Sequence, residues 1–171
     1  MIGEVTLASG RKAQYYVDAR RVLLLPGPFR ALGELVAEEA ARIGATAVGG
    51  PTLGADPIAC AALAGAGGDA LKAFFVRKDR KQHGLQRWVE GPPIGPEDRA
   101  LVVEDVVTSG GSLVTAIERL KEEGVALAGA LAVLDRVAGG REAVEAALGD
   151  PSLPYTALFT IDDVYPERPD R

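Results

Sequence analysis

Residues 101–112 read Leu101-Val102-Val103-Glu104-Asp105-Val106-Val107-Thr108-Ser109-Gly110-Gly111-Ser112. The apolar run predicts a buried parallel strand, and the apolar spacing from Leu113 to about Glu123, ending at Gly124, predicts a helix after it. Open α/β folds bind ligands at the carboxyl ends of such strands, so we expect the two carboxylates to face a ligand. The small residues that follow let the backbone and a helix N-terminus surround a phosphate. This segment therefore predicts a site for a ribose phosphate.

Strands and helices are expected to alternate along the rest of the chain. The residue patterns predict strands at about 46–49, 71–76, 128–134 and 155–161, and helices at 28–43, 57–63 and 141–148. A hairpin is predicted between Glu4 and Asp18. Because strands alternate with helices, we expect right-handed crossovers and a central, mainly parallel sheet flanked by helices. The length of 171 residues predicts one domain, residues 1–171.

Composition excludes several classes of protein. The hydrophobic content is 47%, yet the sequence has no apolar run of membrane-spanning length, and Met1 to Leu7 has no secretory signal pattern. The net charge of −5 argues against nucleic acid as a partner. The one cysteine, Cys60, forms no internal disulfide and fits a cytoplasmic protein. Its apolar neighbours predict a buried, structural thiol.

An irregular segment is predicted from about residue 78 to 98. It has no apolar period and contains three glycines and three prolines. Residues 77–87 carry five Lys or Arg side chains, one Asp and the only histidine, His83. A charged run is usually solvated surface, and that alternative stays open. We favour a mobile cationic loop, because such a loop neutralises the charge of a polyanionic leaving group.

The segment at 101–112 resembles the phosphoribosyl diphosphate (PRPP) motif of type I phosphoribosyltransferases. That motif is an apolar strand, two acidic residues, two apolar residues and a turn rich in Thr, Ser and Gly. No lysine follows the glycines, so the segment does not match the nucleotide-binding loop GxxxxGK[ST]. The alternative is a plain strand–turn–helix corner in which Ser112 caps the helix.

Other segments are similar to one branch of that family, the orotate phosphoribosyltransferases. They are Leu7-Ala8-Ser9-Gly10-Arg11 with Tyr15-Tyr16-Val17-Asp18, Gly49 to Pro57, Phe75-Val76-Arg77-Lys78 with Lys81, His83 and Gly84, and Leu134-Asp135-Arg136. They occur in the family's order and cover about residues 5–136. The resemblance implies the phosphoribosyltransferase fold with a small N-terminal hood at about residues 1–25. It also implies a homodimer whose mobile loop is shared between subunits.

The resemblance further implies an activity and a set of site residues. The activity is Mg²⁺-dependent transfer of the phosphoribosyl group from PRPP to orotate, which gives orotidine 5-monophosphate and pyrophosphate in pyrimidine synthesis. The PRPP-binding residues it implies are Arg77, Lys78, Lys81, His83, Glu104, Asp105, Val106, Val107, Thr108, Ser109, Gly110, Gly111 and Ser112. The orotate-binding residues it implies are Thr108, Arg136, Tyr15 and Tyr16. Lys81 and Asp105 are implied as catalytic, and Mg²⁺ is expected mostly on substrate oxygens, with Glu104 and Asp105 contributing through water.

Two of these assignments have an alternative in which the residues play no part in ligand binding. Arg136 has the alternative of an ordinary arginine at a helix entry. Adjacent tyrosines on a strand, such as Tyr15 and Tyr16, are more often core and surface neighbours than ligand contacts. The chain also departs from the family pattern, because Ala8 stands where many members carry a lysine and Gly54 stands where some carry another. These two departures leave the pyrophosphate contacts open.

Two other functions compete with orotate transfer. A phosphoribosyltransferase for a purine or another base would share residues 101–112. It would not predict the loop pattern Arg-Lys-x-x-Lys-x-His-Gly or Arg136. A regulator that binds PRPP without turnover usually adds a nucleic-acid-binding element, and the acidic chain shows none.

Overall fold

The computed structural model describes residues 2–6, 12–66, 71–79 and 88–169, with side chains from residue 15 onward. Its main sheet has six strands in the order β5-β4-β3-β6-β7-β8. These strands are β3 (Ala47–Pro51), β4 (Lys72–Val76), β5 (Val89–Glu90), β6 (Arg99–Val107), β7 (Ala126–Asp135) and β8 (Tyr155–Thr160). All neighbouring strands pair in parallel except β4 and β5. The predicted fold class, a mainly parallel sheet flanked by helices, is therefore confirmed.

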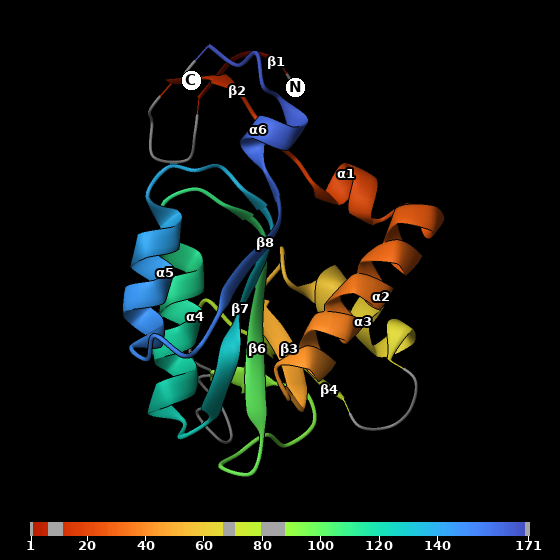
Figure 1. Ribbon diagram of the computed structural model, residues 1–171, viewed down its shortest axis with the longest axis vertical. Helices are drawn as coiled ribbons and strands as arrows, with labels where there is room; N and C mark the ends of the chain where they lie inside the picture. The colour runs from red at the N-terminus through yellow and green to blue at the C-terminus, as the bar shows by residue number, and fades with distance from the viewer. Residues whose placement is uncertain (1, 7–11, 67–70, 80–87, 170–171) are drawn as a thin grey trace.

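Helices cover both faces of this sheet (Figure 1). On one face lie α2 (Pro26–Arg42) and α3 (Asp56–Gly65), and on the other lie α4 (Gly111–Glu122) and α5 (Gly140–Leu148). Helix α4 buries Leu113, Ala116, Ile117 and Leu120, the spacing of one helical face. Two apolar cores result, one on each side of β3, β6 and β7. This layering fixes which strand ends meet at the edge of the sheet.

The N-terminal hairpin forms a separate two-stranded sheet at one end of the molecule. Strands β1 (Ile2–Thr6) and β2 (Lys12–Tyr15) pair antiparallel, as the sequence predicts. They lie close to α6 (Ile161–Val164) and the C-terminus (Figure 1). This hood therefore stands over the carboxyl end of the main sheet.

Three local features differ from the sequence predictions. Part of the segment expected to be irregular forms β5, which pairs with β4 at Phe75 and Val76. The short helices α1 (Arg20–Leu23) and α6 were not predicted. Helices of this size have too few residues to show an apolar period. The prediction of a buried Cys60 is wrong, because α3 packs through Ile58, Ala59, Ala61 and Ala62 and leaves Cys60 exposed.

No helix in the described part of the chain is long and apolar enough to cross a membrane. The longest, α2, has 17 residues and several charged side chains along its length.

Candidate functional site

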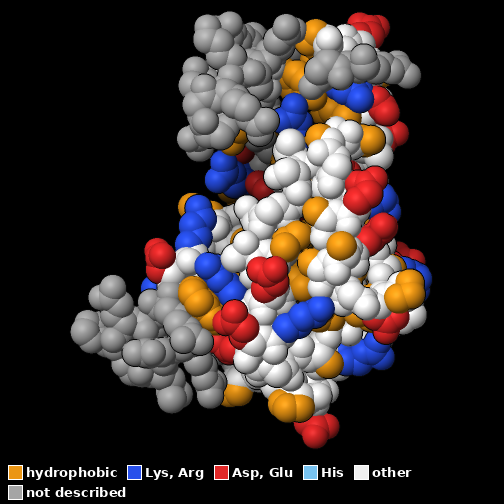
Figure 2. Space-filling model, turned by 90° about the vertical axis from the view of Figure 1, so that its left-hand side faces the viewer, with side chains coloured by type: hydrophobic (Ala, Val, Ile, Leu, Met, Phe, Trp, Pro, Cys, Tyr) orange, Lys and Arg blue, Asp and Glu red, His pale blue; other side chains and the backbone are white. Residues whose placement is uncertain are grey.

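A cavity of about 720 Å³ opens at the carboxyl ends of β3, β4, β6 and β7. Residues at and just after the ends of these strands line it, together with residues 16–18, which lead from the hood to α1, and Arg20, the first residue of α1. In side view, several Lys and Arg side chains lie along the edge of the molecule between two grey regions (Figure 2). The sequence-predicted residues that line this cavity are Tyr16, Lys78, Glu104, Asp105, Val106, Thr108, Ser109, Ser112 and Arg136.

A second hollow of about 270 Å³ adjoins the cavity at the start of α4. Its lining runs from Val106 to Leu113 and includes Glu104, so the predicted Val107, Gly110 and Gly111 belong to it. Gly110 is the N-cap of α4 and has a φ of 78°, a conformation that favours glycine. No side chain caps this helix, so the alternative of Ser112 as the N-cap is wrong. Backbone N–H groups at an uncapped helix N-terminus suit a phosphate.

Both residues of the acidic pair line the larger cavity, and Glu104 also lines the smaller hollow. Glu104 is only 7% exposed, and its Oε1 accepts a hydrogen bond from the backbone N–H of Asp105 at 3.3 Å. Burial, followed by the negative charge of Asp105, raises the pKa of Glu104 to about 8. Asp105 is more open, and its Oδ2 lies 3.8 Å from Nε of Arg20. The pair thus combines one carboxyl that favours its neutral form with one that lies beside a cation.

The loop after β3 packs directly on these carboxylates. A Cβ atom added to Gly54 would lie 2.5 Å from Oε1 of Glu104 and 2.6 Å from Oδ1 of Asp105. The peptide bond between Thr52 and Leu53 in the same loop is cis. The absence of a side chain at residue 54, a departure from the family pattern, therefore allows this loop to pack against the acidic pair.

Arg136 comes from the end of β7, the strand next to β6. Its backbone N–H donates to the carbonyl of Val107 at 2.8 Å, which holds it beside the phosphate turn. The turn after it is fixed by Asp135, whose carboxylate accepts from the Tyr155 hydroxyl at 2.8 Å and from the Val137 N–H at 2.7 Å. Arg136 therefore faces the same cavity as the acidic pair, from the adjacent strand.

The two tyrosines of the hood have different environments. Tyr15 is 3% exposed and lies under Arg136, with the guanidinium carbon 4.6 Å from the ring centre. Its other neighbour is Tyr165, edge-on at 5.5 Å. Tyr16 is 37% exposed and lines the cavity. The cavity lining thus includes Tyr16 and not Tyr15, which instead supports Arg136.

The cationic residues of the long segment are only partly described. Lys81 and His83 lie outside the described residues, and so does Ala8. Lys78 is exposed at the cavity, whereas the side chain of Arg77 forms an ion pair with Glu90 at 3.1 Å. The structure therefore brings Lys78 to the site and directs Arg77 toward β5.

Some cavity residues carried no signal in the sequence. Arg20, Thr115 and Arg119 line the cavity, and Arg20 forms an ion pair with Asp18 at 3.2 Å as well as its contact with Asp105. Nothing in the sequence around these three residues sets them apart from other surface residues. Helix α1, which carries Arg20, was itself not predicted. Asp18 was noted only as part of the extended pair Tyr15 to Asp18.

Comparisons with known proteins show which family the chain resembles in sequence and fold. The phosphoribosyl transferase domain family matches residues 30–148. An orotate phosphoribosyltransferase of Corynebacterium glutamicum (strain R) is 44% identical over 162 residues, which cover 95% of this chain and 85% of that protein. A solved structure of Mycobacterium tuberculosis H37Rv orotate phosphoribosyltransferase with Fe(III) dicitrate is 41% identical, has a TM-score of 0.80, and covers 96% of this chain and 90% of its own. The same enzyme in complex with PRPP superimposes with a TM-score of 0.76 at 37% identity, over 95% of this chain and 90% of that chain.

Proposed function

This chain belongs to the phosphoribosyltransferase family, among the orotate phosphoribosyltransferases, and from that premise we propose how its cavity performs the reaction. The protein transfers the 5-phosphoribosyl group of PRPP to orotate and releases pyrophosphate, in the synthesis of pyrimidine nucleotides. One observation carries the assignment of the site. The acidic pair Glu104–Asp105, the uncapped start of α4 and the guanidinium of Arg136 face one cavity from the adjacent strands β6 and β7.

The PRPP half of the site uses the strand β6 and the turn after it. Backbone N–H groups and hydroxyls between Thr108 and Ser112 hold the 5-phosphate at the start of α4. Glu104 and Asp105 accept hydrogen bonds from the ribose hydroxyls. Lys78, at the end of β4, lies on the side where the diphosphate extends. Lys81, His83 and Arg77 complete the cationic surroundings of the leaving group in this proposal.

The orotate half of the site uses β7 and the hood. Arg136 binds the carboxylate of orotate, because a guanidinium presents two parallel donors to a carboxylate. Tyr16 packs beside the pyrimidine ring, and Thr108 lies between the base and the phosphate turn. Tyr15 acts on orotate through Arg136, since its ring supports the guanidinium from below.

The reaction is a displacement at the anomeric carbon of the ribose. The bond from that carbon to the pyrophosphate oxygen breaks, and a bond to N1 of orotate forms. Orotate N1 attacks as an anion, so the protein need not supply a nucleophile. Its residues position the two substrates, neutralise the leaving group and exclude water. Asp105 and Lys81 are the catalytic residues in this proposal, the first at the ribose and the second at the departing pyrophosphate.

The donor set of the cavity fits a magnesium ion bound chiefly through substrate. Among the described residues, no group of three or more His, Cys, Asp and Glu side chains converges on one point. The cavity does present two adjacent carboxylates, Glu104 and Asp105, and Mg²⁺ prefers oxygen ligands and keeps several waters. When bound, Mg²⁺ would neutralise negative charge on the diphosphate, and Glu104 and Asp105 would hold it through water.

Assembly and location are part of the proposal. The exposed side chains of Val22, Leu24 and Leu25 give the surface around α1 an apolar character suited to contact between two copies. We propose a homodimer in which the loop that carries Lys81 reaches the neighbouring site. The free thiol of Cys60 fits the reducing cytoplasm.

The direct test is a panel of three bases. Purified protein with Mg²⁺ and PRPP is assayed for loss of absorbance with orotate, and uracil and hypoxanthine are assayed alongside. We expect turnover of orotate, and a loss of about 100-fold in kcat/KM for orotate in Arg136→Ala, because the charged contact to the carboxylate is lost. Preferred turnover of uracil or hypoxanthine would keep the PRPP site and contradict the role of Arg136.

A further inference from the structure

Arg119 joins the cavity to two backbone carbonyls at the end of β4. It lies on α4, two turns after the phosphate-binding start of that helix, and its side chain lines the cavity. One guanidinium nitrogen donates to the carbonyl of Arg77, and the other donates to the carbonyl of Lys78 at 2.8 Å. These contacts span 42 and 41 residues of sequence. Arg119 therefore ties the helix that holds the phosphate to the strand end that carries Lys78.

The planar face of the Arg119 guanidinium stacks on an aromatic ring. The carbon Cζ of Arg119 lies 4.1 Å from the ring centre of Trp88, the only tryptophan of the chain. Trp88 is in turn held on α4, because its indole N–H donates to Glu122 at 2.9 Å and its backbone N–H donates to Glu123 at 2.5 Å. Its carbonyl accepts from the backbone N–H of Arg77 at 2.9 Å. The strand end at 77–78 and the chain at residue 88 are thus fixed to one another and to α4.

The arrangement suits arginine and no other side chain. A guanidinium presents several donors in one rigid plane and stacks on an aromatic ring at the same time. A lysine ammonium is a compact point charge and does not offer the two donors as a planar fork. The two donors of Arg119 fix the peptide groups on both sides of Lys78. The Lys78 side chain is exposed, so its place at the cavity is set chiefly by that backbone.

We propose that Arg119 is a positioning residue for PRPP binding. By holding the carbonyls of Arg77 and Lys78 against α4, it keeps the Lys78 ammonium at the edge of the cavity, where it meets the diphosphate of PRPP. The proposal rests on the proposed function only for the identity of this ligand. Arg119 acts through Lys78 and does not itself contact the diphosphate.

The first test measures the dissociation constant of PRPP with Mg²⁺ by isothermal titration calorimetry. Arg119→Ala should weaken binding about tenfold, because two hydrogen bonds that pre-organise the site are lost. Arg119→Lys should fall between the wild type and Arg119→Ala. The matched control is Arg141→Ala. Arg141 also stacks on an aromatic ring, that of Tyr155 at 4.7 Å, and donates to a backbone carbonyl, but it does not line the cavity. Binding within about twofold of wild type in Arg119→Ala would overturn the proposal.

A double-mutant cycle separates positioning from direct contact. If Arg119 acts through Lys78, the double variant Arg119→Ala/Lys78→Ala binds PRPP about as weakly as Lys78→Ala alone. If Arg119 contacts the diphosphate itself, the two losses multiply, and the proposal is wrong. The emission of Trp88 reports whether the contact has been broken, since removal of a cation 4.1 Å from the ring changes its surroundings.

Two unfavourable results would still allow the role of Arg119 to be tested. Should Arg119→Ala fail to fold, Arg119→Lys takes its place in the cycle, because it retains the charge and the aliphatic stem but lacks the planar fork. Should the wild type turn over none of the three bases, calorimetry with PRPP still measures the Arg119–Lys78 coupling. A failure of the proposed function and a failure of this inference are therefore distinguishable.

Discussion

The guanidinium carbon of Arg136 lies 4.6 Å above the centre of the Tyr15 ring, and Tyr15 in turn meets Tyr165 edge-on at 5.5 Å. Three segments distant in sequence, the hood, the end of β7 and the end of α6, thus meet at one cation. A ring under a guanidinium favours the charged group and limits its motion. The orientation of Arg136 therefore depends on an aromatic pair that contributes no lining to the cavity.

Tyr15→Leu should weaken orotate more than PRPP. We expect the KM for orotate to rise about tenfold, since the surface that supports Arg136 is lost, while the KM for PRPP changes little. Tyr15→Phe keeps the ring and is the control, which should stay close to the wild type. Steady-state kinetics with each substrate varied in turn measures both constants. An equal rise in the two KM values would indicate a general disturbance of the hood and not a role in orienting Arg136.

Gly54→Ala should impair activity without unfolding the protein. The atoms that an added Cβ would strike are a carboxylate oxygen of Glu104 and the Oδ1 and Cγ atoms of Asp105, which belong to side chains and not to the backbone. The fold can therefore accommodate the methyl group, but only by displacing the acidic pair. We expect kcat/KM for PRPP to fall about 10- to 100-fold, with a melting temperature near that of the wild type.

The matched control for this substitution is Gly27→Ala. Gly27 lies near the start of α2, and a Cβ there would have no atom within 4 Å. This variant should retain full activity. Wild-type kinetics in Gly54→Ala would show that the loop after β3 moves and the carboxylates do not.

Glu104 should make stability fall as pH rises. Its pKa is raised to about 8 in the folded protein, chiefly by burial, and is near 4.5 when the chain is unfolded. Between these values the folded state holds a proton that the unfolded state has released, so the free energy of unfolding declines with pH. Glu104→Gln removes this decline. It should be more stable than the wild type by about 4 kcal/mol at pH 8 and similar to it below pH 4.5.

Urea unfolding of both proteins at several pH values measures this difference. Glu118→Gln, which removes an exposed charge from the same helix that follows the pair, controls for the loss of one negative charge. A stability difference that does not change with pH would contradict the raised pKa.

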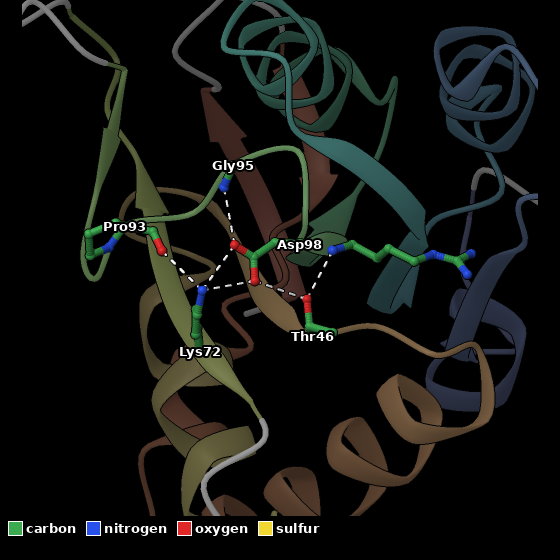
Figure 3. A network of polar contacts seen from close by, with 6 residues as sticks. Thr46, Lys72, Pro93, Gly95 and Asp98 are labelled. Carbon is green, nitrogen blue, oxygen red and sulfur yellow. Dashed lines mark hydrogen bonds and ion pairs between the residues drawn. The ribbon is translucent and has the colours of Figure 1, made fainter.

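Asp98 should have the opposite pH dependence. At the amino ends of the strands, opposite the cavity, its buried carboxylate accepts hydrogen bonds from Lys72 at 3.0 Å, Thr46 at 3.1 Å and the Gly95 N–H at 3.1 Å (Figure 3). Burial raises the pKa of Asp98, but these donors and the charge of Lys72 outweigh it and lower the pKa overall. The stabilisation is therefore present above the unfolded pKa of 3.8 and is lost as pH falls through the lower folded pKa.

Asp98→Asn should cost about 2 kcal/mol at pH 7, since hydrogen bonds to a charged, buried group are weakened or lost. The cost should shrink as pH falls through the lowered folded pKa of Asp98, because the wild-type carboxylate then also becomes neutral. Denaturation at pH 7 and at about pH 2.5 gives both values. The neighbouring exposed Glu97→Gln is the control and should change stability by less than about 0.5 kcal/mol.

Lys81→Ala should lower kcat sharply and leave folding intact. Lys81 lies outside the described residues, and its role at the departing pyrophosphate is part of the proposed function. We expect a loss of about 100-fold in kcat, because a cation that meets charge developing in the transition state is removed. Single-turnover kinetics and a thermal melt measure the two effects. Unchanged turnover would remove Lys81 from the mechanism.

The sequence by itself determined the fold class and the centre of the site. Strand β6, its two carboxylates, the glycine turn and the start of α4 are consecutive in sequence, so their geometry follows from local patterns of apolar and small residues. Arg136, which the resemblance to a family implies as an orotate ligand, also lines the cavity.

The tertiary structure decided which side chains support those residues. Tyr15 lies beneath Arg136, Arg20 lies near Asp105, and Arg119 holds the carbonyl of Lys78. Each of these contacts joins segments at least 41 residues apart, as the Arg119–Lys78 pair illustrates. The physical reason is that apolar periodicity specifies which face of an element is buried. The order and register of strands, and the packing of helices on them, then decide which polar side chains meet at the ends.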